Sequence, residues 1–291
     1  MHTDSHVGRV LEAAGRRVEL DPDTITSPGS VDAARRALGA ALTAVEAVTA
    51  GTVDRVFAAT RPPGHHATGS AAMGFCLFNN VAAATAHALE QPGIRKVLVV
   101  DWDVHHGNGT EAIFADDDRV LFFSAHRSPF YPWTGHADTV HDGLTLNAPM
   151  PKGYKDASIL HPLSALLVPA AQRFEPDLII VSAGYDAHVE DPLGGCALTD
   201  DGFALVAQVV QGLANLHCDG RWIAVLEGGY DLAATARSAV RTVGVMMGDP
   251  APARPQEPAD ALIRGIISRV RAAARKTDWG KGVEWGVGTL R

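Results

Sequence analysis

Short continuous runs of apolar residues alternate along the chain with stretches in which apolar residues recur at helical spacing. The continuous runs predict strands at residues 55–59, 97–101, 120–124, 178–182 and 222–226. An uninterrupted apolar run of this length is typical of a parallel strand that is covered on both faces. The pattern therefore predicts a sheet buried between layers of helices.

Two stretches between the runs predict amphipathic helices, because their apolar residues recur at i, i+3 or i+4, and i+7. Ser30 and Thr199 precede these stretches and are suitable N-cap residues. The apolar positions are Leu38, Leu42 and Val45 after Ser30, and Phe203, Val206, Val210 and Leu213 after Thr199.

The alternation of strand and helix continues without a change in composition. We therefore expect residues 1–291 to form one α/β domain with a mainly parallel central sheet and helices on both faces. The proline-containing stretch 248–258 is expected to lead into a C-terminal helix rather than into a second domain. In an open α/β sheet, ligands bind outside the carboxyl ends of the strands, so the chemistry is expected there.

The composition is that of a globular protein with a sizeable core, since 46% of residues are hydrophobic and 20% are charged. A net charge of -8 argues against a nucleic-acid surface, and no apolar run approaches the ~20 residues that span a bilayer. The three cysteines, Cys76, Cys196 and Cys218, are far apart. They predict neither a disulfide framework nor a thiolate zinc site, and they favour a reducing, cytoplasmic location.

The run that begins at residue 97 ends in Asp101-Trp102-Asp103-Val104-His105. Because side chains alternate along an extended chain, Asp101, Asp103 and His105 are expected on one side. Asp186 follows the apolar run 178–182 and can face the same point. Asp103, His105 and Asp186 would bind one divalent ion, zinc or iron, and leave a position open for water. The alternative is a strand end with hydrogen-bonded acids.

Two further strand ends contain polar residues with catalytic potential. His65 and His66 lie in a loop fixed by proline and glycine, where they can act as a general base and acid near neutral pH. Tyr230 follows two glycines and can donate to an oxyanion. Taken alone, a histidine pair is more often structural, and a Gly-Gly-Tyr motif is weak.

Together, the segments RPPGHH (61–66), DWDVHHGNG (101–109), GYDAH (184–188) and LEGGY (226–230) resemble the histone deacetylase family, within the arginase/deacetylase fold. The resemblance extends from about His2 to Gly248. Asn108 is similar to the residue found in the class II branch and its bacterial relatives, which include acetylpolyamine amidohydrolases. The resemblance implies a zinc-dependent amidohydrolase that removes acetyl groups from acetyl-lysine or similar acetylated amines.

The resemblance also assigns metal sites. It implies that Asp103, His105 and Asp186 bind one zinc ion. A potassium ion is implied near Asp101, Asp103, His105 and Ser124.

The same resemblance implies the catalytic roles. His66 would be the general base and then the general acid, with His65 as its electrostatic partner. Asp101 would orient His65, and Asn108 would lie beside His66. Tyr230 would polarise the acetyl carbonyl.

Three residues are implied to contact substrate. Phe75 and Tyr131 take the places of the two aromatic walls of the acetyl-lysine tunnel, and Tyr131 adds a hydroxyl to a wall that is commonly phenylalanine. Leu193 replaces the acid that holds a distant ammonium in polyamine-selective relatives. We therefore expect acetyl-lysine peptides or simple acetylated amines to be preferred over acetylspermidine.

Two other departures from the family pattern concern segments. The loop 138–146 is shorter and poorer in glycine than its counterparts, which bears on substrate choice. The family's segment before the part that matches His2, including an early strand, is not found. We expect either a start further upstream or an association with another chain, such as a homo-oligomer, that covers the exposed sheet.

Two rival functions remain open. An arginase-like ureohydrolase shares the sheet but needs two manganese ions and more carboxylate ligands. A binding protein that retains the fold without turnover is the second.

Overall fold

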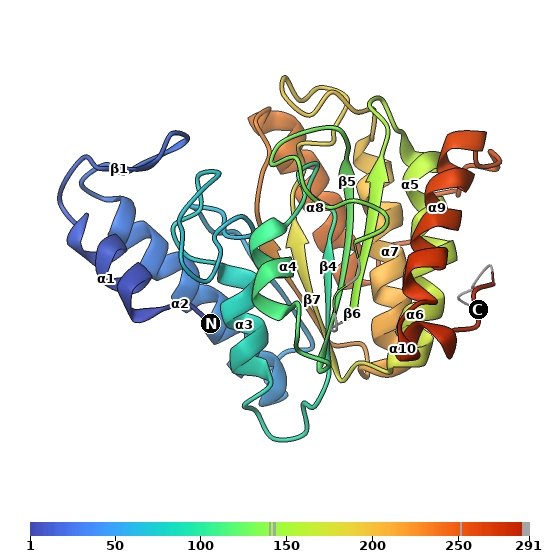
Figure 1. Cartoon of the computed structure of the whole chain (residues 1–291), viewed down its shortest axis with the longest axis horizontal. Coiled ribbons are helices and arrows are strands. Elements are labelled where there is room, and N and C mark those ends of the chain that lie inside the picture. The colour runs from blue at the N-terminus through green and yellow to red at the C-terminus, as the bar shows by residue number, and fades with distance from the viewer. Residues whose placement is uncertain (140, 142–143, 251, 287–291) are drawn as a thin grey trace.

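The computed structural model describes all residues of the chain except 140, 142–143, 251 and 287–291. At its centre lies a six-stranded parallel sheet with the order β3-β8-β7-β4-β5-β6 (Figure 1). A separate antiparallel hairpin pairs β1 (Glu19–Asp21) with β2 (Thr24–Ile25). The strands of the sheet are β3 (Arg55–Ala58), β4 (Val97–Asp101), β5 (Val120–Arg127), β6 (Leu144–Met150), β7 (Leu178–Ala183) and β8 (Trp222–Leu226).

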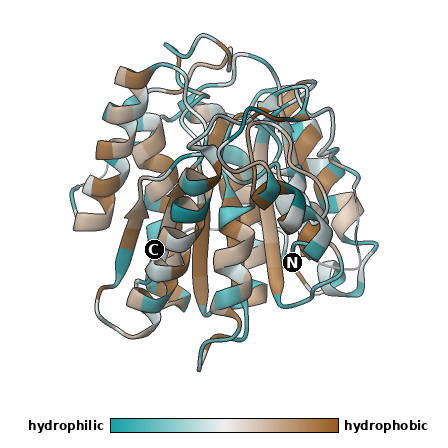
Figure 2. Ribbon diagram, turned by 90° about the vertical axis from the view of Figure 1, so that its left-hand side faces the viewer, coloured by the Kyte–Doolittle hydropathy of each residue, from teal (hydrophilic) through white to brown (hydrophobic). Residues whose placement is uncertain are grey.

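Helices cover both faces of the sheet, and Figure 2 shows the apolar strands between them. Along β4, Val97 and Val99 belong to the core on one face, and Leu98 and Val100 to the core on the other, as the alternation of a strand requires. The first layer contains α2 (Ser30–Thr49), α3 (Asn80–Ala88) and α4 (Asn108–Phe114), with α1 (Asp4–Glu12) packed beside α2. The second contains α5 (Asp156–Pro162), the π-helical turn η1 (Leu163–Leu167), α6 (Val168–Phe174), α7 (Asp200–His217), α8 (Leu232–Met247), α9 (Ala261–Ala274) and α10 (Asp278–Lys281).

The single α/β domain and its five predicted strands are confirmed, and β4 and β8 have the predicted bounds. The edge strand β6 was not predicted, because Thr145, Asn147 and Pro149 interrupt its apolar pattern. Proline is tolerated in an edge strand, where an N–H can face away from the sheet. The expected loop 138–146 lies partly outside the described residues, and its last part, from Leu144, belongs to β6.

The helix predicted after Thr199 is confirmed, and the Thr199 hydroxyl accepts a hydrogen bond from the backbone N–H of Gly202. The cap predicted for α2 was wrong, since Gly29 is the N-cap and Ser30 is the first helical residue. Leu38 and Leu42 are only half-buried. Smaller side chains form the buried stripe of α2, which lets α2 pack closely against the alanine-rich α3. These are Val31, Ala34, Ala37, Ala41, Ala44, Val45 and Val48.

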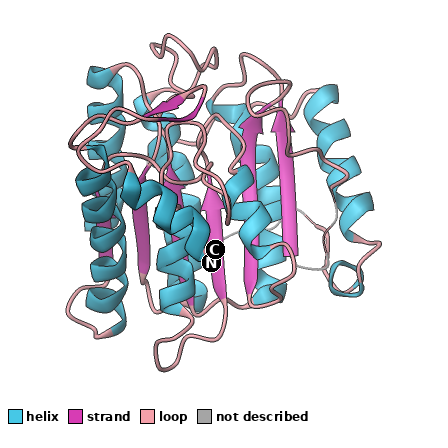
Figure 3. Cartoon of the chain, turned by 60° about the vertical axis from the view of Figure 1, so that its left-hand side comes forward, coloured by secondary structure: helices cyan, strands magenta, loops and turns pink. Residues whose placement is uncertain are grey.

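The expected C-terminal helix is α9, although residue 251 of the preceding stretch lies outside the described residues. In the described part of the chain, no helix is long and apolar enough to cross a bilayer. The loops that follow the carboxyl ends of the strands gather at one end of the sheet (Figure 3). Most of the predicted site residues lie in these loops, whereas Asp101, Ser124 and Asn108 lie in β4, β5 and α4.

Candidate active site and metal centre

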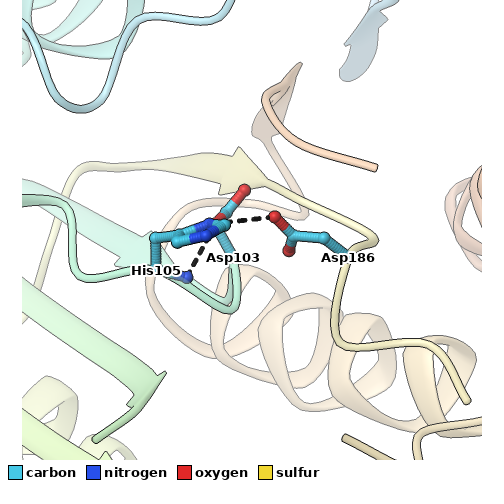
Figure 4. A group of neighbouring side chains, drawn as sticks. All are labelled: Asp103, His105 and Asp186. Atoms are coloured by element: carbon cyan, nitrogen blue, oxygen red, sulfur yellow. Dashed lines mark hydrogen bonds and ion pairs between the residues drawn. The ribbon is translucent and has the colours of Figure 1, made fainter. Parts of the chain in front are cut away.

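The acids and the imidazole that follow β4 and β7 converge at one point. Candidate ligand atoms of Asp103, His105 and Asp186 all lie within 4.8 Å of one another, and the three residues are buried (Figure 4). His105 Nδ1 lies 3.0 Å from Asp103 Oδ1 and 3.1 Å from Asp186 Oδ2. Parallel pairing of β4 with β7 produces this proximity, because it aligns Asp101 with Ser182 and so brings the two strand ends together.

The donor set fits a divalent metal ion. One imidazole nitrogen and two carboxylates are ligands of catalytic zinc or iron, and three protein ligands leave an open position. Apart from its close approach to His105 Nδ1, the buried Oδ2 of Asp186 has no hydrogen-bond partner among the described residues, so it is available as a ligand. A Cβ atom on Gly228 would lie 2.4 Å from Asp186 Oδ2 and 2.7 Å from Asp103 Oδ2. Glycine is therefore needed where this loop closes around the carboxylates.

The electrostatics of these three residues also favour a cation. Burial and the charge of Asp103 raise the pKa of Asp186, because two carboxylates lie close together away from water. Burial alone would raise the pKa of Asp103, but the charges of His65 and His105 hold it below its ordinary value. A bound cation would offset the repulsion between the two carboxylates.

The adjacent histidines from the loop after β3 lie beside this centre in two different environments. His65 Nδ1 donates to Asp101 Oδ2 at 2.9 Å, whereas His66 Nδ1 donates to Asn108 Oδ1 at 2.8 Å. Burial would lower the pKa of His65, but the charge of Asp101 together with those of the other nearby carboxylates outweighs this effect and holds the pKa well above its ordinary value. Burial and the neighbouring charges of His65 and His105 hold the pKa of His66 well below its ordinary value. The two side chains lie side by side, with ring centroids 4.0 Å apart, and the opposite shifts in pKa favour a charged His65 and a neutral His66.

Glu227 is a buried site residue whose role the sequence did not reveal. Its Oε2 accepts hydrogen bonds from the backbone N–H groups of Gly64 at 2.6 Å and His65 at 3.1 Å, and Oε1 accepts from the Ser182 hydroxyl at 3.2 Å. Burial raises the pKa of Glu227 to about 7. Glu227 thus joins the loop after β8 to the loop that contains the histidines. Its position directly after a strand, before two glycines, is the only sequence signal.

Tyr230 faces the metal centre from the loop after β8, with its ring centroid 6.5 Å from that of His105. Burial and the charges of Asp186 and Asp103 raise the pKa of its hydroxyl, which therefore stays protonated. Asp191 fixes the backbone at this point, because its Oδ2 accepts from the Tyr230 N–H at 2.7 Å. No pattern in the sequence predicts this contact, because it joins a loop carboxylate to the backbone of another loop.

Aromatic side chains surround the centre. The Tyr131 ring stands edge-on to His66 at 5.2 Å, and the Phe75 ring stands edge-on to Tyr230 at 6.4 Å. Phe75 is 48% exposed and Tyr131 is half-buried, so Phe75 lies at the surface. Phe130, which the sequence analysis assigned no role, stacks on His105 with centroids 4.9 Å apart. Sequence reasoning selected Tyr131 from the Phe-Tyr-Pro segment and missed its neighbour.

Leu193 is 53% exposed in the loop between β7 and α7. Asp191 Oδ1 accepts from the N–H groups of Leu193 and Gly194, each at 2.9 Å. Arg127 donates to the Gly194 carbonyl at 3.0 Å and lies 4.0 Å from the centroid of the Phe130 ring. Leu193 is thereby held at the surface of the loops that enclose the centre.

Ser124 lies in β5 directly beside Asp101 of β4. Its hydroxyl bonds to His126 Nδ1 at 2.8 Å, in the buried interior. Asp101 is the last residue of β4, and its Oδ1 also accepts a hydrogen bond from the backbone N–H of Asp103 at 3.1 Å. The potassium site expected near these residues stays a prediction.

Comparison with known proteins gives a consistent picture. The sequence profile described as "Histone deacetylase domain" matches residues 1–246. Histone deacetylase 5 of Arabidopsis thaliana is 39% identical over 93% of this chain and 44% of its own length. The human "Polyamine deacetylase HDAC10" is 43% identical over 85% of this chain and 38% of its own length. A "Histone deacetylase-like amidohydrolase" of Pseudomonas aeruginosa is 40% identical over 72% of this chain and 57% of its own length.

Among solved structures, the crystal structure of the HDA15 HD domain superimposes with a TM-score of 0.89 and 36% identity. The matched region covers 96% of this chain and 78% of the HDA15 chain. The chain spans less than half the length of the Arabidopsis and human relatives, so their matched parts form one region of longer proteins.

Proposed function

Because the chain belongs to the histone deacetylase family, we propose that it is a zinc-dependent amidohydrolase that removes acetyl groups from acetyl-lysine or similar acetylated amines. The observation that supports this proposal best is the buried group of Asp103, His105 and Asp186, with His66 on one side and Tyr230 on another. Asp103, His105 and Asp186 would hold the ion. When bound, zinc supplies polarisation of the acetyl carbonyl and lowers the pKa of a water molecule.

His66 is the proposed proton carrier. Because its Nδ1 donates to Asn108, Nε2 is the nitrogen that can accept a proton. A pKa well below its ordinary value keeps this ring neutral near pH 7, so it can take a proton from the attacking water. It then returns the proton to the amine as the carbon–nitrogen bond breaks.

The proposed partners of His66 stabilise charge. The ring centroids of His65 and His66 lie 4.0 Å apart. Because Asp101 favours the charged form of His65, this charge repels a protonated His66 and favours transfer of the proton from His66 to the leaving amine. Tyr230 would donate a hydrogen bond to the acetyl oxygen as negative charge develops there. Phe75 and Tyr131 would flank the apolar stem of the acetylated side chain.

Two secondary proposals concern ions and location. Asp101, Asp103, His105 and Ser124 are the residues proposed to lie at a potassium site. The pairing of Asp101 with Ser124 across β4 and β5 supports this assignment. The three cysteines are buried and unpaired, which supports a reducing, cytoplasmic location.

The test combines metal analysis with turnover. Purified protein should bind one zinc or iron ion per chain and hydrolyse an acetyl-lysine peptide, and a chelator should abolish the activity reversibly. His66→Ala should retain the metal and lose turnover. Metal-loaded protein that hydrolyses no acetylated amine would favour a binding role, whereas two manganese ions with hydrolysis of a guanidino substrate would favour the ureohydrolase.

A further inference from the structure

A basic hollow of about 470 Å³ lies between α9 and the segment formed by α5 and η1. Figure 1 shows α9 and α5 together on the flank of the sheet that is far from α1 and α2. The volume is within the range of small-molecule sites. Its polar lining consists of Arg264, Ser268 and Arg271 from α9, its C-cap residue Arg275, and His161 and Ser164 from the facing segment.

The three residues of α9 and the C-cap Arg275, which keeps a helical backbone, form one continuous ridge. Their spacings of four, three and four residues place them on the same face of the helix. Arg271 and Arg275 are four residues apart, an arrangement that is unfavourable for two like charges on a helix. None of the three arginines forms an ion pair with a described carboxylate, and no acidic residue lines the described part of the hollow. In a chain of net charge -8, this concentration of positive charge has no internal counter-ion.

Two buried nitrogen atoms at this hollow lack hydrogen-bond partners among the described residues. They are Arg271 Nε and His161 Nε2. Arg271 is held in place, because its Nη2 donates to the carbonyls of Ala165 at 2.9 Å and Gly286 at 3.0 Å. The remaining Nε–H of a fixed guanidinium is then a donor without an acceptor, which is costly for a buried group.

We infer that this hollow is a binding site for a small molecule that contains a phosphate or diphosphate group. Guanidinium groups match the oxygens of phosphate in pairs, and three of them favour a multivalent anion over a monovalent carboxylate. Ser164 and Ser268 supply hydroxyl donors for the remaining oxygens. The size of the hollow leaves room for more than the phosphate group itself. The acidic net charge of the chain argues against nucleic acid as the source of the phosphate.

The site is separate from the proposed catalytic centre, so its test does not depend on deacetylation. Pyrophosphate is the probe, titrated by calorimetry and by thermal melting at constant ionic strength, with acetate as the monovalent comparison. We expect saturable binding of pyrophosphate, a rise in melting temperature that follows saturation, and no saturable binding of acetate.

The variant Arg264→Gln/Arg275→Gln removes two exposed charges from the ridge and leaves the fixed Arg271 intact. It should bind pyrophosphate at least tenfold more weakly and melt at the wild-type temperature without ligand. Arg269→Gln is the matched control, because Arg269 is an exposed arginine of α9 that does not line this hollow. Equal loss in the control and the double variant would indicate a general charge effect and overturn the proposal. So would a lack of saturable binding, or binding to anionic lipid vesicles alone.

Discussion

The carboxylate of Asp191 accepts a hydrogen bond from the backbone N–H of Tyr230 at 2.7 Å, which joins the loop after β7 to the loop after β8. The other oxygen of the same carboxylate accepts hydrogen bonds from the backbone N–H groups of Leu193 and Gly194. Asp191 is therefore a positioning residue, since it sets where the Tyr230 hydroxyl lies without touching the reacting atoms.

Asp191→Asn should preserve one half of this arrangement. The amide oxygen can still accept from Leu193 and Gly194, but the amide nitrogen cannot accept from Tyr230. A misplaced donor should reduce kcat by roughly tenfold, equivalent to about 1.4 kcal/mol, with little change in KM. Kinetics on an acetyl-lysine peptide test this, and Asp191→Glu should restore part of the rate. If Asp191→Asn lowered the melting temperature but left kcat unchanged, Asp191 would have a structural role only.

Tyr230→Phe removes the hydroxyl itself. Since the proposed role is donation to the developing oxyanion, kcat should fall by roughly 10²-fold or more while the metal content stays the same. Steady-state kinetics and metal analysis on the same sample check both parts. Wild-type turnover in this variant would rule out the oxyanion role. In combination with Asp191→Asn, the two losses should not add, because both act through one hydroxyl.

Asp186→Ala should lose the metal ion. Only Asp103 and His105 would remain as ligands from the buried group, and two ligands bind zinc weakly. Metal analysis after dialysis should give one ion per chain in the wild type and well below one in the variant. Asp191→Asn serves as a control, because it changes a nearby acid that does not belong to this group. Retention of a full equivalent by Asp186→Ala would show that the ion is bound elsewhere.

The strand ends were predictable because their physics is local. Alternation along an extended chain predicts Asp101, Asp103 and His105 on one side, and the parallel topology brings Asp186 to the same edge. The strand ends at Asp101, and backbone N–H groups donating to Asp101 and Asp103 complete the turn to His105. The contacts of Asp191 and Glu227 were not predictable, because each joins a side chain to the backbone of a distant loop. A loop acid offers no sequence pattern from which such a partner can be deduced.

The same limit explains the missed strand and the missed aromatic residue. The strand β6 contains Thr145, Asn147 and Pro149, and only its pairing with β5 makes it a strand. Phe130 and Tyr131 are adjacent, and either side chain is chemically suitable for a wall. The backbone conformation decides that Phe130 stacks on His105, whereas Tyr131 stands edge-on to His66.

Leu193→Glu should shift substrate preference toward acetylated polyamines. The new carboxylate would lie at an exposed position of the loop held by Asp191, where it can attract a distant ammonium group. A partly screened charge pair contributes about 1 kcal/mol, so kcat/KM for acetylspermidine relative to an acetyl-lysine peptide should rise by roughly fivefold. The uncharged Leu193→Gln is the control. Acetylspermidine favoured more than tenfold by the wild type would contradict the expected preference for acetyl-lysine.

Glu111 lies at the centre of a second group of polar residues, on α4. Its Oε2 accepts from His106 at 3.0 Å and from Asn147, and its Oε1 accepts from His141 at 3.1 Å. Burial alone would raise the pKa of Glu111, but the hydrogen bonds and the charge of His106 lower it to about 2. The ionised form is therefore preferred in the folded state, and it joins α4 to β6 and to His141.

Glu111→Gln should destabilise the protein in a pH-dependent way. Because the folded state lowers the pKa of Glu111 from its ordinary value near 4.5 to about 2, its contribution to the free energy of unfolding is complete above about pH 4.5. The contribution then decreases as the pH falls toward 2, where the carboxylate is protonated in both states. At pH 7 the variant should be less stable by about 1.5–3 kcal/mol, the range for a hydrogen bond to a charged group.

Urea unfolding of wild type and Glu111→Gln from pH 7 to pH 3 should show a constant difference in the free energy of unfolding down to about pH 4.5 and a smaller difference below it. Glu12→Gln, at an exposed position of α1, should show no such difference. A gap between wild type and Glu111→Gln that stays constant to pH 3 would mean that ionisation of Glu111 does not stabilise this region.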